Sequence, residues 1–103
     1  MNWSIRSLAF AAAAVCLTAP AMAQEDLLKK YGCLACHTLD KKLVGPAYKD
    51  VAAKYKDQAD APEKLYQKVR RGGQGVWGQI PMPPNPTVPE AELRSMIKFV
   101  LSQ

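Results

Sequence analysis

Four stretches of the chain carry apolar residues at the spacing of one helix face, and no two stretches convincingly pair as strands. The first runs roughly from Glu25 to Gly32. The second follows Gly45-Pro46. Its apolar and aromatic positions have the i, i+3, i+4, i+7 spacing of an amphipathic helix, at Tyr48, Val51, Ala52 and Tyr55. This pattern predicts an all-α domain built from short helices.

The third and fourth stretches begin at typical helix start signals. Asp60 has capping-box spacing to Glu63, and the third stretch runs on to Arg71, where two glycines stop it. The fourth is expected to begin near Thr87, with Glu90 three residues on. It carries a continuous apolar stripe, formed by Leu93, Met96, Ile97, Val100 and Leu101.

The segment 72–86 between the last two helices is rich in glycine and proline, which predicts a loop. It is also unusually apolar, through Val76, Trp77, Ile80 and Met82. A loop of this composition needs a large apolar group to cover.

The N-terminal segment reads as an export signal, with Arg6 as its only charge, an apolar run from Leu8 to Leu17, and small residues at Ala21 and Ala23. We expect cleavage after Ala23. A membrane anchor is disfavoured because the run is shorter than the roughly 20 apolar residues that span a bilayer. A lipoprotein signal at Cys16 is disfavoured because no small residue precedes that cysteine.

The expected mature domain, residues 24–103, has roughly 80 residues, a size at which apolar burial alone rarely holds a fold together. A disulfide, a bound metal or another stabilising cross-link is therefore expected. Cys33 and Cys36 are the two cysteines that remain after cleavage. In an exported protein they would ordinarily suggest a disulfide, but their spacing suggests something else.

The sequence Cys33-Leu34-Ala35-Cys36-His37 is the haem attachment motif C-x-x-C-H. Each cysteine sulfur adds to one vinyl group of the haem, and two intervening residues let both sulfurs reach from one turn of backbone. The adjacent histidine then lies under the ring, where it can bind the iron. We therefore expect one covalent haem c.

Two other uses of C-x-x-C fit less well. A thioredoxin-like redox pair needs a βαβ context, which the pattern lacks. A structural zinc site needs four protein ligands, and Cys33, Cys36 and the single histidine His37 do not complete a cysteine and histidine set.

The second axial ligand cannot be histidine, because His37 is the only one in the chain. Methionine is the expected ligand, with lysine or an open site as alternatives. Met82 and Met96 are the candidates in the mature chain. Met96 belongs to the apolar stripe of the last helix, which favours core packing, whereas Met82 lies in a proline-stiffened loop. Met82 is the favoured ligand.

These residues resemble the small bacterial class I cytochromes c, the short-loop periplasmic type of respiratory and denitrifying chains. The likeness covers nearly all of the mature chain. It is carried by the stretches Gly32-Cys33-Leu34-Ala35-Cys36-His37, Val44-Gly45-Pro46-Ala47-Tyr48-Lys49-Asp50-Val51-Ala52, Gln74-Gly75-Val76-Trp77-Gly78 and Ile80-Pro81-Met82-Pro83-Pro84-Asn85. The resemblance implies the class I cytochrome c fold, with about four short helices wrapped around one covalently bound haem.

The resemblance also implies roles for individual residues. Pro46 should offer its carbonyl to the ring N–H of His37, Trp77 should donate to a haem propionate, and Asn85 should hydrogen-bond near the Met82 sulfur. The ring should be packed by the final helix together with Tyr48, Val51, Tyr55, Leu65 and Val69. Three residues depart from the usual family pattern around the propionates and the core, namely Lys68, Arg71 and Phe99.

The expected function is single-electron transfer in the periplasm rather than catalysis. A membrane quinol-oxidising complex or another cytochrome would be the donor, and a nitrite reductase or terminal oxidase the acceptor. The chain is basic, with a formal net charge of +5. Its lysines suggest either a solvated face or transient docking on acidic patches of partners; they are Lys29, Lys30, Lys41, Lys42, Lys49, Lys54 and Lys56.

We expect a monomer without stable membrane insertion and without nucleic-acid binding. Two alternatives stay open at this point. A small haem peroxidase or gas-binding cytochrome would need an open iron site, against which Pro81-Met82-Pro83 argues. A subunit of a larger oxidase or reductase is the other.

Overall fold

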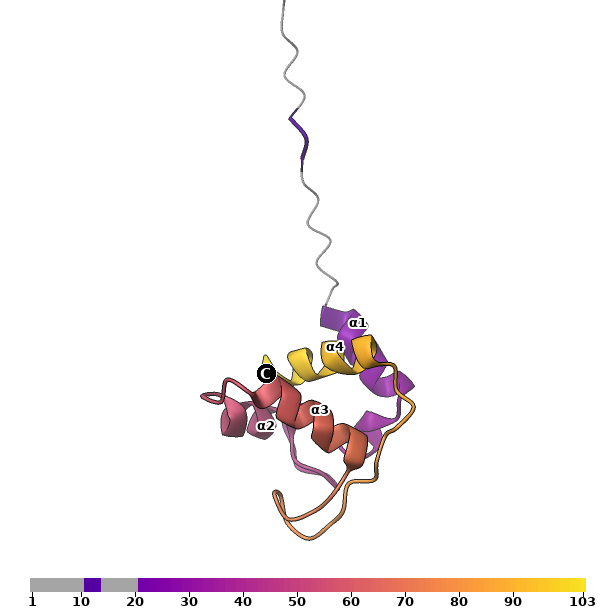
Figure 1. Cartoon of the computed structure of the whole chain (residues 1–103), viewed down its shortest axis with the longest axis vertical. Coiled ribbons are helices and arrows are strands. Elements are labelled where there is room, and N and C mark those ends of the chain that lie inside the picture. The colour runs from indigo at the N-terminus through magenta and orange to yellow at the C-terminus, as the bar shows by residue number, and fades with distance from the viewer. Residues whose placement is uncertain (1–10, 14–20) are drawn as a thin grey trace, which may run out of the picture.

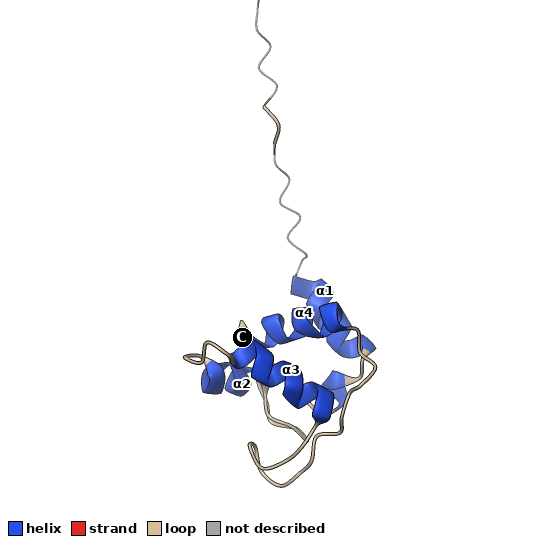
Figure 2. Cartoon of the chain, viewed as in Figure 1, coloured by secondary structure: helices blue, strands red, loops and turns tan. Residues whose placement is uncertain are grey.

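The computed structural model describes residues 11–13 and 21–103, and the leader predicted for residues 1–23 lies largely outside them. The described part contains four α-helices and one short 3-10 helix, and it is all-α as predicted (Figure 1 and Figure 2). In these residues no strand is present, only an isolated antiparallel bridge between Gly73 and Met82. The elements are α1 (Ala21–Lys30), η1 (Cys33–Ala35), α2 (Tyr48–Tyr55), α3 (Ala61–Arg71) and α4 (Glu90–Leu101).

The predicted start of α3 at Asp60 is confirmed, whereas the predicted side-chain cap of α3 and the predicted start of α4 are wrong. Asp60 is the N-cap of α3, but its side chain caps no backbone N–H and instead lies 3.5 Å from Lys64 Nζ. Helix α4 begins at Glu90 rather than near Thr87. Pro89 explains the difference, because the residue before a proline is disfavoured in the α-helical region.

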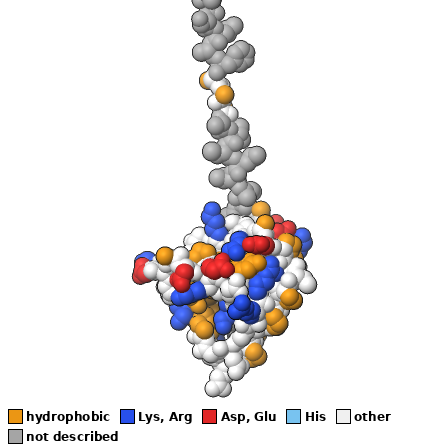
Figure 3. All heavy atoms as spheres, in the orientation of Figure 1, with side chains coloured by type: hydrophobic (Ala, Val, Ile, Leu, Met, Phe, Trp, Pro, Cys, Tyr) orange, Lys and Arg blue, Asp and Glu red, His pale blue; other side chains and the backbone are white. Residues whose placement is uncertain are grey.

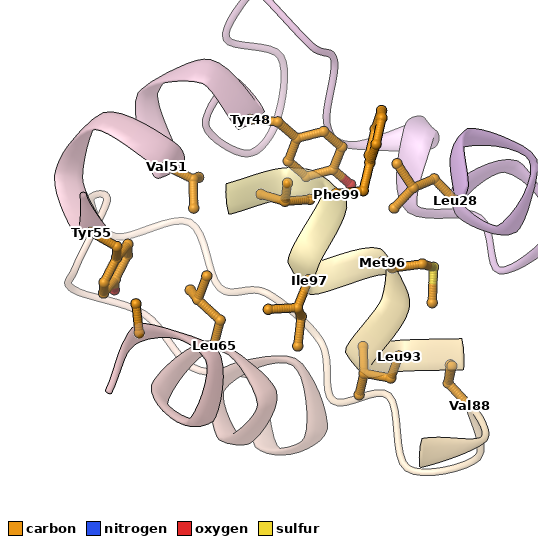
Figure 4. Packing of buried hydrophobic residues seen from close by; sticks show 12 residues of the cluster. Leu28, Tyr48, Val51, Tyr55, Leu65, Val88, Leu93, Met96, Ile97 and Phe99 are labelled. Atoms are coloured by element: carbon orange, nitrogen blue, oxygen red, sulfur yellow. The ribbon is translucent and has the colours of Figure 1, made fainter. Parts of the chain in front are cut away.

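Helix α4 forms the centre of the fold, since it contacts each of the other three α-helices. Figure 4 shows Val51, Leu65 and Ile97 pointing toward one another from α2, α3 and α4. Near the start of α4, the Glu92 carboxylate accepts a hydrogen bond from the hydroxyl of Tyr31, which lies just after α1. The buried cluster comprises Leu28, Tyr48, Val51, Tyr55, Ala61, Leu65, Val88, Leu93, Met96, Ile97, Phe99 and Val100.

The loop after α3 leaves the helix end, turns back and returns to α4 along the edge of the molecule (Figure 1). Its two arms are joined where the Gly73 and Met82 backbones exchange hydrogen bonds of 3.0 and 2.9 Å. Gly72 begins the loop with φ 68°, and a Cβ there would lie 2.3 Å from the Met82 carbonyl oxygen. Only glycine lets the loop pass so close to the helix end. None of the described helices has the length and apolar character needed to cross a membrane.

Candidate functional site

The C-x-x-C-H motif folds as one tight turn. Gly32 precedes η1 with φ 73°, and the Cys33 carbonyl accepts hydrogen bonds from the backbone N–H groups of Cys36 (3.2 Å) and His37 (3.0 Å). Cys33 and Cys36 are half-buried free thiols on this turn. Burial raises the pKa of the Cys33 thiol. The turn thus presents two sulfurs and an imidazole within five residues of chain.

The imidazole of His37 is held by a backbone carbonyl. Its Nδ1 lies 2.8 Å from the Pro46 carbonyl oxygen, the contact that the family resemblance implied. A carbonyl can only accept, so Nδ1 carries the proton and Nε2 keeps a free lone pair. The ring also stacks on Tyr48, with centroids 5.0 Å apart and planes 18° from parallel. Burial raises the pKa of the Tyr48 phenol.

Gly45 makes this arrangement possible, which the sequence analysis did not foresee. A Cβ at this position would lie 2.5 Å from His37 Cε1 and 2.9 Å from Nδ1. Its backbone N–H also donates to the Cys36 carbonyl at 2.7 Å, closing the loop onto the motif. The sequence did contain a sign of this role, because Gly45 directly precedes Pro46, the residue expected to hold His37.

The motif opens onto a cavity of about 200 Å³. Mostly apolar side chains from all four α-helices line it, together with the loop after α3. The predicted packing residues Tyr48, Val51, Tyr55, Leu65 and Val69 are all among them. The remaining predicted site residues also line it, namely Cys33, Cys36, His37, Pro46, Trp77, Met82 and Asn85.

Both candidate methionines reach the cavity. Met82 enters from the loop, on the bridge to Gly73, and is half-buried. Met96 lines the cavity from α4 but is only 2% exposed and packs within the apolar cluster (Figure 4). The structure therefore brings the two thioethers to one cavity from two different kinds of chain segment.

Trp77 lies at the rim, 40% exposed, with Lys54 Nζ from α2 at 5.3 Å from its ring centroid. Lys68 also lines the cavity, and its Nζ lies 3.2 Å from where a Gly73 Cβ would stand. Arg71 is exposed, and Phe99 is buried in the core. Two cationic side chains thus approach the rim of the cavity near the loop.

The side-chain amide of Asn85 makes its described hydrogen bonds to backbone carbonyls. Its side-chain amide donates to the carbonyls of Val69 (3.3 Å) and Pro83 (3.1 Å), and the described contacts include none to the Met82 sulfur. Its backbone N–H also donates to the Val69 carbonyl at 3.0 Å. Asn85 therefore ties the loop to α3, because the Val69 carbonyl lies in the last turn of the helix, where it has no intrahelical partner, and accepts both of these donors.

The donor set suits a covalently attached haem. Two free thiols and an imidazole with a free Nε2 lie on one turn, and a thioether, Met82, enters the same cavity from the loop. The remaining lining is largely apolar, as a flat apolar macrocycle requires.

The known proteins that this chain resembles point to the same cofactor. The family model described as Cytochrome c matches residues 24–103. Cytochrome c-551 of Pseudomonas aeruginosa is 57% identical over 79 residues, which cover 77% of this chain and 75% of the relative. The crystal structure of wild-type Nitrosomonas europaea cytochrome c552 is 50% identical, covers 76% of this chain and 96% of its own, and has a TM-score of 0.72.

The fold comparison extends to a more distant protein. The crystal structure of the class 1 cytochrome MtoD from Sideroxydans lithotrophicus ES-1 is 27% identical, covers 81% of this chain and 95% of its own, and has a TM-score of 0.67. The predicted fold class and family are therefore confirmed. The chain belongs to the cytochrome c family, small electron carriers with covalently bound haem c.

Proposed function

We propose that this chain is an exported single-electron carrier with one haem c, attached through Cys33 and Cys36 and ligated by His37 and Met82. The observation that carries the proposal is the shared cavity, which takes part of its lining from each of these four residues. When bound, the haem supplies an iron that gains and loses one electron.

The protein's own residues do the orienting. The Pro46 carbonyl fixes the His37 tautomer and ring plane, leaving Nε2 directed away from the carbonyl. The Gly73–Met82 bridge fixes the backbone that carries the thioether. The apolar lining keeps water out and disfavours extra charge, which favours the reduced state and a positive potential. Trp77 and Lys68 are the proposed partners of a haem propionate.

The surface near the cavity is suited to brief protein contacts. Val76, Trp77 and Ile80 line the cavity and are exposed, Ile80 by 64%. Leu43 and Val44 are also exposed, and they directly precede the Gly45-Pro46 pair that contacts His37. Exposed Lys41 and Lys42 adjoin Leu43. We propose that acidic patches of redox partners dock here transiently, with a quinol-oxidising complex or a cytochrome as donor. A nitrite reductase or terminal oxidase would be the acceptor.

We further propose that the leader is removed after Ala23 and that the carrier works in the periplasm as a monomer. The export and cleavage rest on the n-region, apolar run and small residues of the leader. The mass of the secreted protein would locate the cleavage site directly.

One preparation tests the haem site. Protein made with the haem maturation system should keep its haem through acid-acetone extraction, and Cys33→Ala or Cys36→Ala should lower that yield sharply. The oxidised spectrum should show the weak red band of sulfur–iron charge transfer. An intact Cys33–Cys36 disulfide without haem would refute attachment. Rapid carbon monoxide binding by the wild-type protein would indicate a ligand-binding haem protein instead.

A further inference from the structure

In the described part of the chain, the hydrogen bonds between the segment that carries Met82 and α3 all involve one residue of that segment, Asn85. Its backbone N–H and its side-chain amide both donate to the Val69 carbonyl, at 3.0 and 3.3 Å, and the amide also donates to Pro83. These bonds use the N–H donors of Asn85. Its backbone carbonyl needs a donor from another residue.

Arg70 supplies that partner. Its Nη1 donates to the Asn85 carbonyl at 3.1 Å, while its Nε donates to the Tyr66 hydroxyl at 3.2 Å. The two bonds leave one planar guanidinium in two directions, which a lysine ammonium on its flexible stem cannot reproduce. The side chain is half-buried, so water competes less for these bonds than at an open surface.

The guanidinium is itself held in place by an aromatic stack. It lies over the Tyr66 ring at 5.1 Å, and Arg94 of α4 lies over the same ring at 4.1 Å. Arg94 is fixed by Glu63 at 3.2 Å and Glu90 at 3.1 Å. Figure 3 shows acidic and basic side chains gathered together over α3 and α4. The chain of contacts therefore runs from α4 through Tyr66 and Arg70 to the loop.

We propose that Arg70 is a positioning residue that, through the Asn85 carbonyl, holds the Met82 segment against α3. The consequence for the iron rests on the proposed function, in which Met82 is a ligand. We call the contact of Arg70 with the Asn85 carbonyl the brace. The brace itself does not rest on the proposed function, because it is made entirely of contacts between this chain's own residues. The neighbouring Arg71 is exposed and has no described hydrogen bond or ion pair, so it offers a matched control of equal charge.

The test compares haem-loaded Arg70→Met, Arg70→Lys and Arg71→Met by hydrogen exchange of the reduced protein. The readout is the protection of the Asn85 amide divided by that of the Tyr48 amide. The Tyr48 amide donates to the Thr38 carbonyl rather than to the loop, so it reports general opening. Both Arg70 variants should lower this ratio about ten-fold relative to Arg71→Met, the size of one charge-assisted hydrogen bond. An unchanged ratio overturns the brace.

A second readout links the brace to Met82. Reduced Arg70→Met and Arg70→Lys should bind carbon monoxide about ten-fold faster than Arg71→Met, because a loosened thioether leaves the iron more often. A lowered exchange ratio with unchanged carbon monoxide binding overturns the positioning role. If the wild-type protein lacks the red charge-transfer band, the ligand assignment of the proposed function fails, and the exchange ratio still decides whether the brace exists.

Discussion

Two methionines reach the cavity, and they differ in what holds them. Met96 is fixed within a buried helix face, whereas Met82 sits on a bridged loop between prolines. If Met82 is the ligand, Met82→Ala should abolish the red band, lower the potential and open the iron to carbon monoxide. Met96→Leu conserves volume and should cost less than about 1.5 kcal/mol of unfolding free energy while keeping the band. Spectra and urea titrations of the two variants decide this, and the reverse pattern would transfer the assignment to Met96.

Single residues were predictable where chemistry limits the choice. The motif Cys33 to His37 follows from the haem's two vinyl groups, and Pro46 follows from the family pattern. Gly45 was missed because its role depends on a side chain eight residues earlier folding back over it. The bonds of Asn85 to the Val69 and Pro83 carbonyls could not be predicted, because a side-chain amide can bind any of several carbonyls and the sequence does not say which lies nearest.

At the level of elements, the junction of α3 with the loop depends on Gly72. Its backbone, with φ 68° and ψ −158°, is almost restricted to glycine, and an added Cβ would collide with the Met82 and Pro84 backbones. Gly72→Ala should therefore lower the unfolding free energy by about 1–3 kcal/mol for strain, and more for the collision.

Gly75→Ala is the control, because Gly75 also has a positive φ but a Cβ there would meet nothing within 4 Å. Denaturant titration should give a larger loss of unfolding free energy for Gly72→Ala than for Gly75→Ala. Equal losses in the two variants would mean that the collision is relieved by movement of the loop.

The contact between α3 and α4 should depend on pH through Glu63. Hydrogen bonds from Gln67 and then from Arg94 hold the pKa of this carboxyl below its usual range. A carboxyl whose pKa is lower in the folded state stabilises above its unfolded pKa and loses that contribution as pH falls through the folded value. Glu63→Gln should therefore destabilise at neutral pH and converge on the wild type in acid.

Urea midpoints of both proteins across the acid range measure this convergence. The difference in urea midpoint between the wild type and Glu63→Gln at neutral pH should also become smaller at about 1 M salt, where exposed charges are screened beyond roughly 3 Å. A difference in urea midpoint that stays constant with pH would show that Glu63 acts through its shape rather than its charge.

The helices themselves were predictable to different degrees. The apolar period of α2 predicted its span from Tyr48 to Tyr55, because that helix has one buried face. One start signal was wrong for a physical reason, because Pro89 displaced the start of α4. Asp60 marked the start of α3 correctly, although its side chain pairs with Lys64 rather than capping the helix. Tyr66 and Arg70 stand at helical i, i+4 spacing, so their contact could have been foreseen, but the reach of Arg70 to the loop could not.

For the whole molecule, the cavity lies at the centre of the apolar core, since nine of the twelve residues of the buried cluster also line the cavity. Its lining runs from Leu28 on α1 to Val100 on α4, and a domain this small has little core besides. Protein made without haem should therefore be largely unfolded by circular dichroism, and the haem-loaded protein should be helical. A cooperative, fully helical protein without haem would contradict this dependence.

The tight turn that presents Cys33 and Cys36 has a consequence for the lifetime of the carrier. Two thioether bonds from one turn close a ring of only a few residues, so they restrict the unfolded chain far less than a domain-spanning disulfide would. The main effect of the two thioether bonds is to keep the haem attached to the chain. When the fold opens briefly, the tethered group stays at high effective concentration and returns by an intramolecular step. Loss of the redox group is then governed by the breaking of covalent bonds and is indifferent to dilution.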